Sequence, residues 1–99
     1  MRTREKKLSD YGVPNALYRE IKERCYNSTD EDRETLHLVC YLNTPAWVSQ
    51  FVFRSLARRE SYDEIMKWDY IPVKSDDFYG YQRRAMAAYY LTLTDRQKW

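Results

Sequence analysis

The chain has 99 residues, of which 43% are apolar and 16% aromatic, and its 17 basic and 15 acidic side chains leave a net charge of +2. This length suits one domain spanning residues 1–99, and no apolar run reaches the ~18 residues of a membrane span. The first residues, MRTREKK, lack the apolar segment of a secretory signal, so we expect a cytoplasmic protein. With two glycines, three prolines and no segment that alternates with a period of two, the composition predicts an all-α fold.

The first quarter of the chain contains a polar end, a turn and one helix. Residues 1–10 are polar, and we expect them to be frayed. Gly12 and Pro14 then give the chemistry of a turn. From residue 15, the stretch NALYREIKERCYN places apolar side chains four residues apart, which predicts a helix of about three turns.

Two further helices are predicted in the middle of the chain. The stretch STDEDRETLHLVCYLN begins with capping residues and acids, which suit a helix N-terminus, and continues with enough apolar side chains for a buried helix. In NTPAWVSQFVFRSLARRE, Thr44 is the predicted N-cap and Pro45 occupies the first helical position, where a missing N–H costs nothing.

A short fourth helix is predicted to follow Ser61. Ser61 and Glu64 have the spacing of a capping box, and Ile71 before Pro72 is steered away from helical geometry. The predicted buried side of this helix consists of Tyr62, Ile65, Met66 and Trp68.

The fifth helix is predicted from Ser75 to about Leu93, which completes a compact bundle of about five short helices. A helical wheel gathers an apolar stripe on one side of this helix. That stripe consists of Phe78, Gln82, Ala85, Met86, Tyr89 and Leu93. The opposite side carries Asp76, Gly80, Arg83, Arg84, Ala87 and Leu91.

Gly80 raises the main question about function, because glycine inside a helix costs about 1 kcal/mol relative to alanine. In one interpretation, Gly80 and Ala87 form a low ridge that a foreign backbone can approach, while Arg83 and Arg84 bind phosphates or acidic side chains. In the other, Gly80 only allows the neighbouring tyrosines to pack, and the arginines are solvated.

The layout of residues 61–93 favours the first interpretation. A short capped helix, a turn and a longer helix with basic residues are typical of a helix-turn-helix, whose second helix enters the major groove of DNA. The pattern SYDEI…I resembles the SYEEI…I pattern of sigma-factor region 4 and related regulators. The predicted turn is longer than in that pattern, and Asp76 and Asp77 would repel phosphate at the start of the second helix. The residues predicted to bind DNA are Lys74, Tyr79, Gly80, Gln82, Arg83 and Arg84.

A second resemblance covers the two ends of the chain. KLSDYGV near the start and IPVKSDDFYGYQRRAMAAYYL near the end resemble small proteins of phages and prophages in Gram-positive bacteria. Some members of that group are similar to the late-transcription regulators of the ArpU and RinA groups. The resemblance implies a phage-encoded DNA-binding protein that regulates transcription in a bacterial host cell. The sequence does not decide between a monomer and a homodimer.

An alternative of another class is a phage anti-defence inhibitor, such as an anti-CRISPR protein, that binds a host nuclease or effector protein. In this hypothesis Asp30, Glu31, Asp32 and Glu34 mimic phosphate, and exposed tyrosines and Trp99 contact the partner. The plainer interpretation of these acids is that they favour a helix N-terminus.

Catalytic chemistry is not indicated by the sequence. His37 is the single histidine, no second histidine or cysteine stands at metal-ligand spacing, and no glycine-rich loop precedes a helix. We therefore expect no enzyme activity, no metal and no cofactor. Cys25 and Cys40 have neither metal nor redox spacing and are interpreted as core residues, with a disulfide as the minor alternative.

Overall fold

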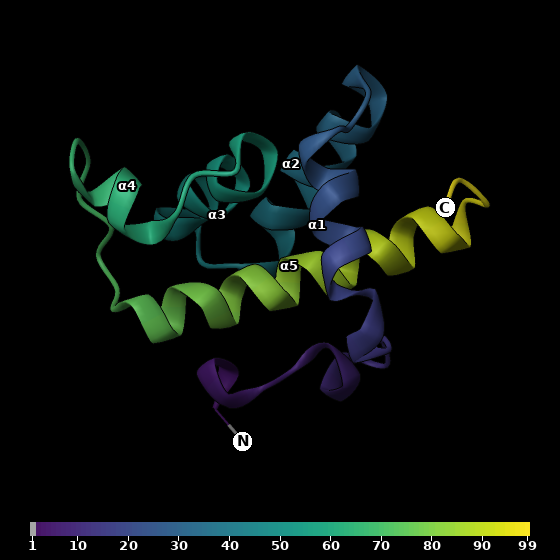
Figure 1. Cartoon of the computed structure of the whole chain (residues 1–99), viewed down its shortest axis with the longest axis horizontal. Helices are drawn as coiled ribbons and strands as arrows, with labels where there is room; N and C mark the ends of the chain where they lie inside the picture. The colour runs from purple at the N-terminus through teal and green to yellow at the C-terminus, as the bar shows by residue number, and fades with distance from the viewer. Residues whose placement is uncertain (1) are drawn as a thin grey trace.

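The computed structural model describes residues 2–99, and all the regular secondary structure in that range is helical (Figure 1). This confirms the predicted all-α class. The five α-helices are α1 (Tyr18–Tyr26), α2 (Asp30–Asn43), α3 (Ala46–Arg58), α4 (Tyr62–Met66) and α5 (Ser75–Asp95). Three 3-10 turns precede them: η1 (Thr3–Glu5), η2 (Leu8–Tyr11) and η3 (Asn15–Leu17).

Helix α5 is the central element, because protein covers it on two opposite sides. Figure 1 shows α5 running between the bundle of α1 to α4 and the N-terminal segment, and α5 contacts α1, α2 and α3 as well as η1 and η2. The whole predicted apolar stripe of α5 is buried, and so are Gly80 and Ala87 on the side that we expected to face outward. The core therefore lies against two sides of α5 instead of one.

The expected fraying of residues 1–10 is wrong for residues 3–10, and Met1 lies outside the described residues. The turns η1 and η2 lie along α5, and Leu8 and Val13 are buried in the core. A backbone hydrogen bond from Val13 N–H to the Leu8 carbonyl closes the turn. Gly12 lies within this turn, directly after η2, and has a φ of 80°, a left-handed conformation that glycine adopts without strain.

The caps of the helices agree only in part with the prediction. Thr29 and Ser61 cap α2 and α4 by accepting from the backbone N–H of Asp32 and Glu64, at 3.2 and 3.1 Å. Thr44, the predicted N-cap of α3, instead closes α2 by donating its hydroxyl to the Cys40 carbonyl at 2.6 Å. Pro45 takes the N-cap position, so that α3 begins at Ala46, one residue later than predicted.

The C-terminal residues fold back onto α1 and α2. Arg24 donates to the Lys98 carbonyl at 2.8 Å and also pairs with Asp32 at 3.1 Å. The ring of Trp99 packs edge-on against Tyr90 with centroids 4.8 Å apart, and Lys98 pairs with Glu31. The tail thus closes the end of the bundle at which α5 finishes.

Candidate interaction surface

The ridge around Gly80 is occupied by the protein's own N-terminal segment. A Cβ atom at Gly80 would lie 2.7 Å from Arg4 Cα and 2.8 Å from the Thr3 carbonyl oxygen. Arg83 donates to the carbonyls of Lys6 and Arg4, at 2.7 and 2.9 Å. The prediction that glycine permits a close backbone approach is confirmed, but the prediction that the approaching backbone is foreign is wrong for this structure.

The other residues of the predicted DNA-binding face do not share one surface. Gln82 is buried and donates its amide to the Ser55 hydroxyl at 3.1 Å, and the Tyr79 hydroxyl accepts from Tyr62 N–H at 3.0 Å. Lys74 and Arg84 are exposed, but they are ten residues apart on α5 and its N-cap. The site predicted from the sequence is therefore not brought together.

The unit predicted as a helix-turn-helix departs from that geometry. Helix α4 has five residues, and residues 67–74 separate it from α5, whereas a helix-turn-helix has a turn of about three or four residues. A recognition helix also needs one free face along the groove. Protein covers α5 on two sides, so its length cannot enter a major groove in this conformation.

The predicted acidic mimic, Asp30 to Glu34, is largely used within the protein. Asp32 is buried and paired with Arg24, and Glu31 pairs with Lys98 of the folded-back tail. Asp30 and Glu34 are exposed beside Arg33, at the edge of a hollow between α2 and α3. Because two of the four acids are paired within the protein, one with the tail and one with α1, this stretch is not a free acidic surface.

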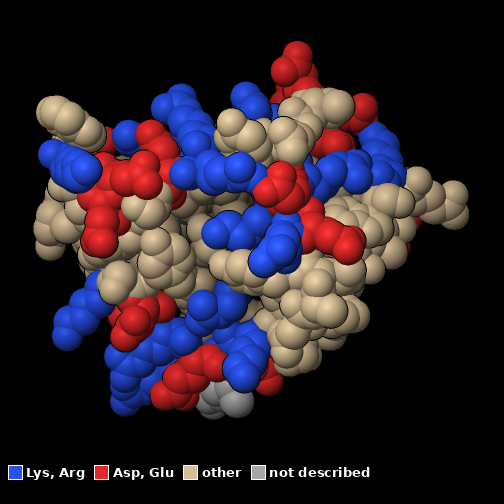
Figure 2. Space-filling model, viewed as in Figure 1, with Lys and Arg blue, Asp and Glu red and all other residues tan. Residues whose placement is uncertain are grey.

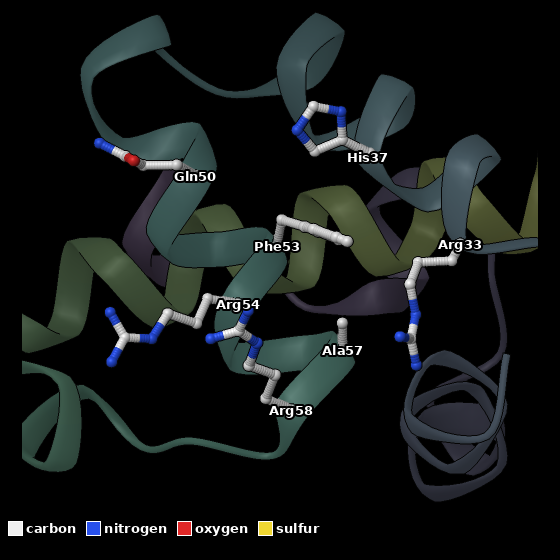
Figure 3. Close-up of a pocket in the computed structure, with 7 residues that line it drawn as sticks. All are labelled: Arg33, His37, Gln50, Phe53, Arg54, Ala57 and Arg58. Atoms are coloured by element: carbon white, nitrogen blue, oxygen red, sulfur yellow. The ribbon is translucent and has the colours of Figure 1, made fainter. Parts of the chain in front are cut away.

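A cavity of about 290 Å³ lies between α2 and α3, and Figure 3 shows its lining. His37 packs edge-on against Phe53 with ring centroids 4.9 Å apart, as expected for a structural histidine. Three arginines surround the cavity, but Figure 3 shows Arg33 on one side and Arg54 and Arg58 on the other. The Arg54 guanidinium group also forms ion pairs with Glu60 and Asp69. The basic groups do not converge on one point, as an anion site requires.

The segment between α4 and α5 exposes the largest apolar side chains of this region. Trp68 has 83% of its surface exposed and Tyr70 has 76%, with Met66 beside them. The prediction that Met66 and Trp68 lie on the buried side of a helix is wrong, because Met66 is the last residue of α4 and Trp68 lies beyond it. Ile65 and Ile71, on either side of the aromatic residues, are the side chains that enter the core.

Several contacts hold this segment in one conformation. Asp69 pairs with Arg54 of α3 at 2.7 Å, and Ile71 N–H points at the Met66 sulfur at 3.1 Å. The Tyr62 hydroxyl donates to the Val73 carbonyl at 2.5 Å. With these contacts in place, the backbone that carries Trp68 and Tyr70 loses little conformational freedom when a partner binds.

The part of the chain that carries the exposed aromatic residues is acidic. Residues 61–77 carry five carboxylates and two lysines, and Figure 2 shows acidic groups gathered over α4 and near the start of α5. The acids are Asp63, Glu64, Asp69, Asp76 and Asp77. We call Met66, Trp68, Tyr70 and these five acids the acidic-aromatic surface. The sequence did contain a signal for it, since Trp68 and Tyr70 lie within three residues before Ile71, and Ile71 precedes Pro72, where a helix must have ended.

None of the helices within residues 2–99 is both long enough and apolar enough to span a membrane. Within the same residues, no three histidine, cysteine or acidic side chains gather as metal ligands would. Comparison with known proteins gives no match to a family model, a curated protein or a solved structure.

Proposed function

We propose that this protein works by binding another protein, and that the partner presents a basic surface of the kind that binds nucleic acid. The observation that carries the proposal is the acidic-aromatic surface, on which Trp68 and Tyr70 are exposed in a segment with four carboxylates besides Asp69, whose carboxylate is paired with Arg54. Tryptophan and tyrosine are the residues that most often dominate the energy of a protein interface. Carboxylates around them favour a positively charged partner.

The phage resemblance of the sequence directs the choice of partner. A nuclease or another effector of host defence has a basic channel for nucleic acid, and a small acidic surface can occupy such a channel in place of phosphate. We therefore propose an anti-defence inhibitor in the cytoplasm of a bacterial host as the first function to test. Its contact residues are those of the acidic-aromatic surface, in place of Asp30 to Glu34.

The hypothesis of a DNA-binding regulator receives less support. Its basic ridge is covered by residues 3–6, and the exposed start of α5 carries Asp76 and Asp77, which repel phosphate. Direct DNA binding stays a prediction, and the experiment below distinguishes it from binding to a protein.

The test is affinity capture from a bacterial lysate from which nucleic acid has been removed. The wild-type protein is compared with a Trp68→Ala, Tyr70→Ala double variant. A Tyr18→Ala, Tyr26→Ala variant serves as the matched control, because it removes two partly exposed aromatic residues from α1. We expect a nucleic-acid-binding protein that wild type and control retain, that the loop variant loses, and that short duplex DNA displaces.

Two results would contradict the proposal. In one, the loop variant captures the same proteins as wild type. In the other, purified protein shifts labelled duplex DNA at low salt and the shift survives the loop substitutions, which would favour the regulator. Both substituted residues are largely solvent-exposed, so circular dichroism should show an unchanged fold.

A further inference from the structure

A long stretch of the chain contains no charged side chain. Residues 35–53 include no aspartate, glutamate, lysine or arginine, although these types make up 32% of the whole sequence. The stretch covers the C-terminal part of α2, the turn after it and the first half of α3. Uncharged sequence of this length is expected in a buried helix, but here part of it faces solvent.

Four large apolar side chains of this stretch are exposed. On α2 they are Leu38, Tyr41 and Leu42, with 50%, 60% and 68% of their surface exposed. Their spacing of three and four residues places them on one face of the helix. Trp47, with 52% of its surface exposed, is the second residue of α3, just past the short connection from α2. We call these four residues the uncharged patch.

The area of the uncharged patch approaches that of an interface core. A large apolar side chain offers roughly 150–250 Å². At the exposed fractions given above, the four together leave about 500 Å² in water, near the upper end of what a monomer exposes in one patch. A standard interface removes about 800 Å² from each partner. Neighbours that are exposed or partly exposed and also uncharged, namely Asn43, Ala46 and Gln50, can supply much of the remainder.

We infer that the uncharged patch binds a second copy of this chain, so that the protein forms a homodimer about a two-fold axis. In such an interface the same surface meets itself, and any charge near the axis would face an identical charge. The absence of charge from residues 35–53 removes that repulsion. Homodimer interfaces are also more apolar than the contacts of transient partners. The uncharged patch has no carboxylates to attract a partner with a basic surface. The acidic-aromatic surface lies on other elements.

The test is the mass of the protein in solution, measured by light scattering or sedimentation over a wide range of concentrations. We expect the mass to rise from monomer towards dimer as concentration increases. Leu42→Glu should weaken self-association about 100-fold, because each copy would place a carboxylate in the contact. Tyr41→Lys is a second variant with the opposite charge and the same expected effect. Trp68→Glu is the matched control and should leave the mass unchanged.

The dependence of binding on salt concentration distinguishes self-association through the uncharged patch from the proposed binding of a basic partner. Association through an uncharged patch between two chains of charge +2 should not weaken as salt is raised, whereas capture of a basic partner by the acidic-aromatic surface should. A wild-type protein that stays at monomer mass at the highest concentration would overturn the inference. So would a dimer that persists in both Leu42→Glu and Tyr41→Lys.

Discussion

At the scale of single residues, Gly80 shows how one side chain can be excluded by the chain's own backbone. Its missing Cβ makes room for Arg4 and Thr3, whose backbone atoms lie closer than a side chain tolerates. The sequence indicated that something approaches this position, because glycine in a helix costs stability. It did not indicate what approaches, because the approaching residue, Arg4, is 76 positions away in the sequence and belongs to a segment without apolar periodicity.

We predict that Gly80→Ala destabilises the full chain by about 1–3 kcal/mol, since the new methyl group pushes against backbone and forces η1 off the helix. In a chain that lacks residues 2–5 the same substitution should stabilise by about 1 kcal/mol, because only helix propensity then acts. Urea unfolding of the four proteins measures both effects. A stabilising effect in the full chain would show that η1 does not pack there.

At the scale of elements, the N-terminal segment is held on α5 by a single guanidinium group as well as by Leu8. Arg83 donates to the carbonyls of Arg4 and Lys6, and its neighbour Arg84 is exposed. Two adjacent arginines that looked equivalent in the sequence thus have different roles. One satisfies backbone carbonyls within the protein, and the other is available to solvent.

We predict that Arg83→Met destabilises the protein by about 1–2 kcal/mol, because two carbonyls lose a charged donor. It should also speed hydrogen exchange of the amides in residues 3–11. Arg84→Met is the matched control and should change neither quantity measurably, since this side chain is exposed. Equal effects of the two substitutions would mean that the segment is not attached through Arg83.

The helices differ in how well the sequence alone predicts where they begin and end. Helix α2 was predictable from its cap at Thr29 and its apolar spacing, both of which are local features. The end of α4 was less predictable, because Trp68 continues the spacing of Ile65 although the helix stops at Met66. Whether an aromatic side chain after a helix end is buried depends on tertiary packing, which periodicity does not record. The acidic-aromatic surface was missed for this reason.

At the scale of the whole molecule, two buried thiols link stability to alkaline pH. Cys25 and Cys40 are both buried, as predicted for core residues, and both are free thiols. Burial raises the pKa of Cys40 from 9.0 to about 12 and raises that of Cys25 further, with the nearby Cys40 as an added cause. Burial also raises the pKa of the Tyr89 hydroxyl in the core.

The sign of the pH effect follows from these directions. Well below pH 9 the thiols are protonated in both the folded and the unfolded chain, so they do not make stability depend on pH. Between pH 9 and about 12 the unfolded chain releases the Cys40 proton while the folded chain retains it, so stability is lost as pH rises. The slope is about 1.4 kcal/mol per pH unit for each group in this regime.

We predict that the free energy of unfolding, measured with urea, is level from pH 7 to about pH 8, begins to fall as pH approaches 9 and falls steeply above it. Cys40→Ala should be less stable than wild type at pH 7, because it leaves a cavity, but should lose less stability between pH 9 and pH 11. Arg84→Met provides a control in which the alkaline slope is unchanged. A wild-type slope that Cys40→Ala does not reduce would show that the Cys40 thiol ionises as readily in the folded protein as in the unfolded chain.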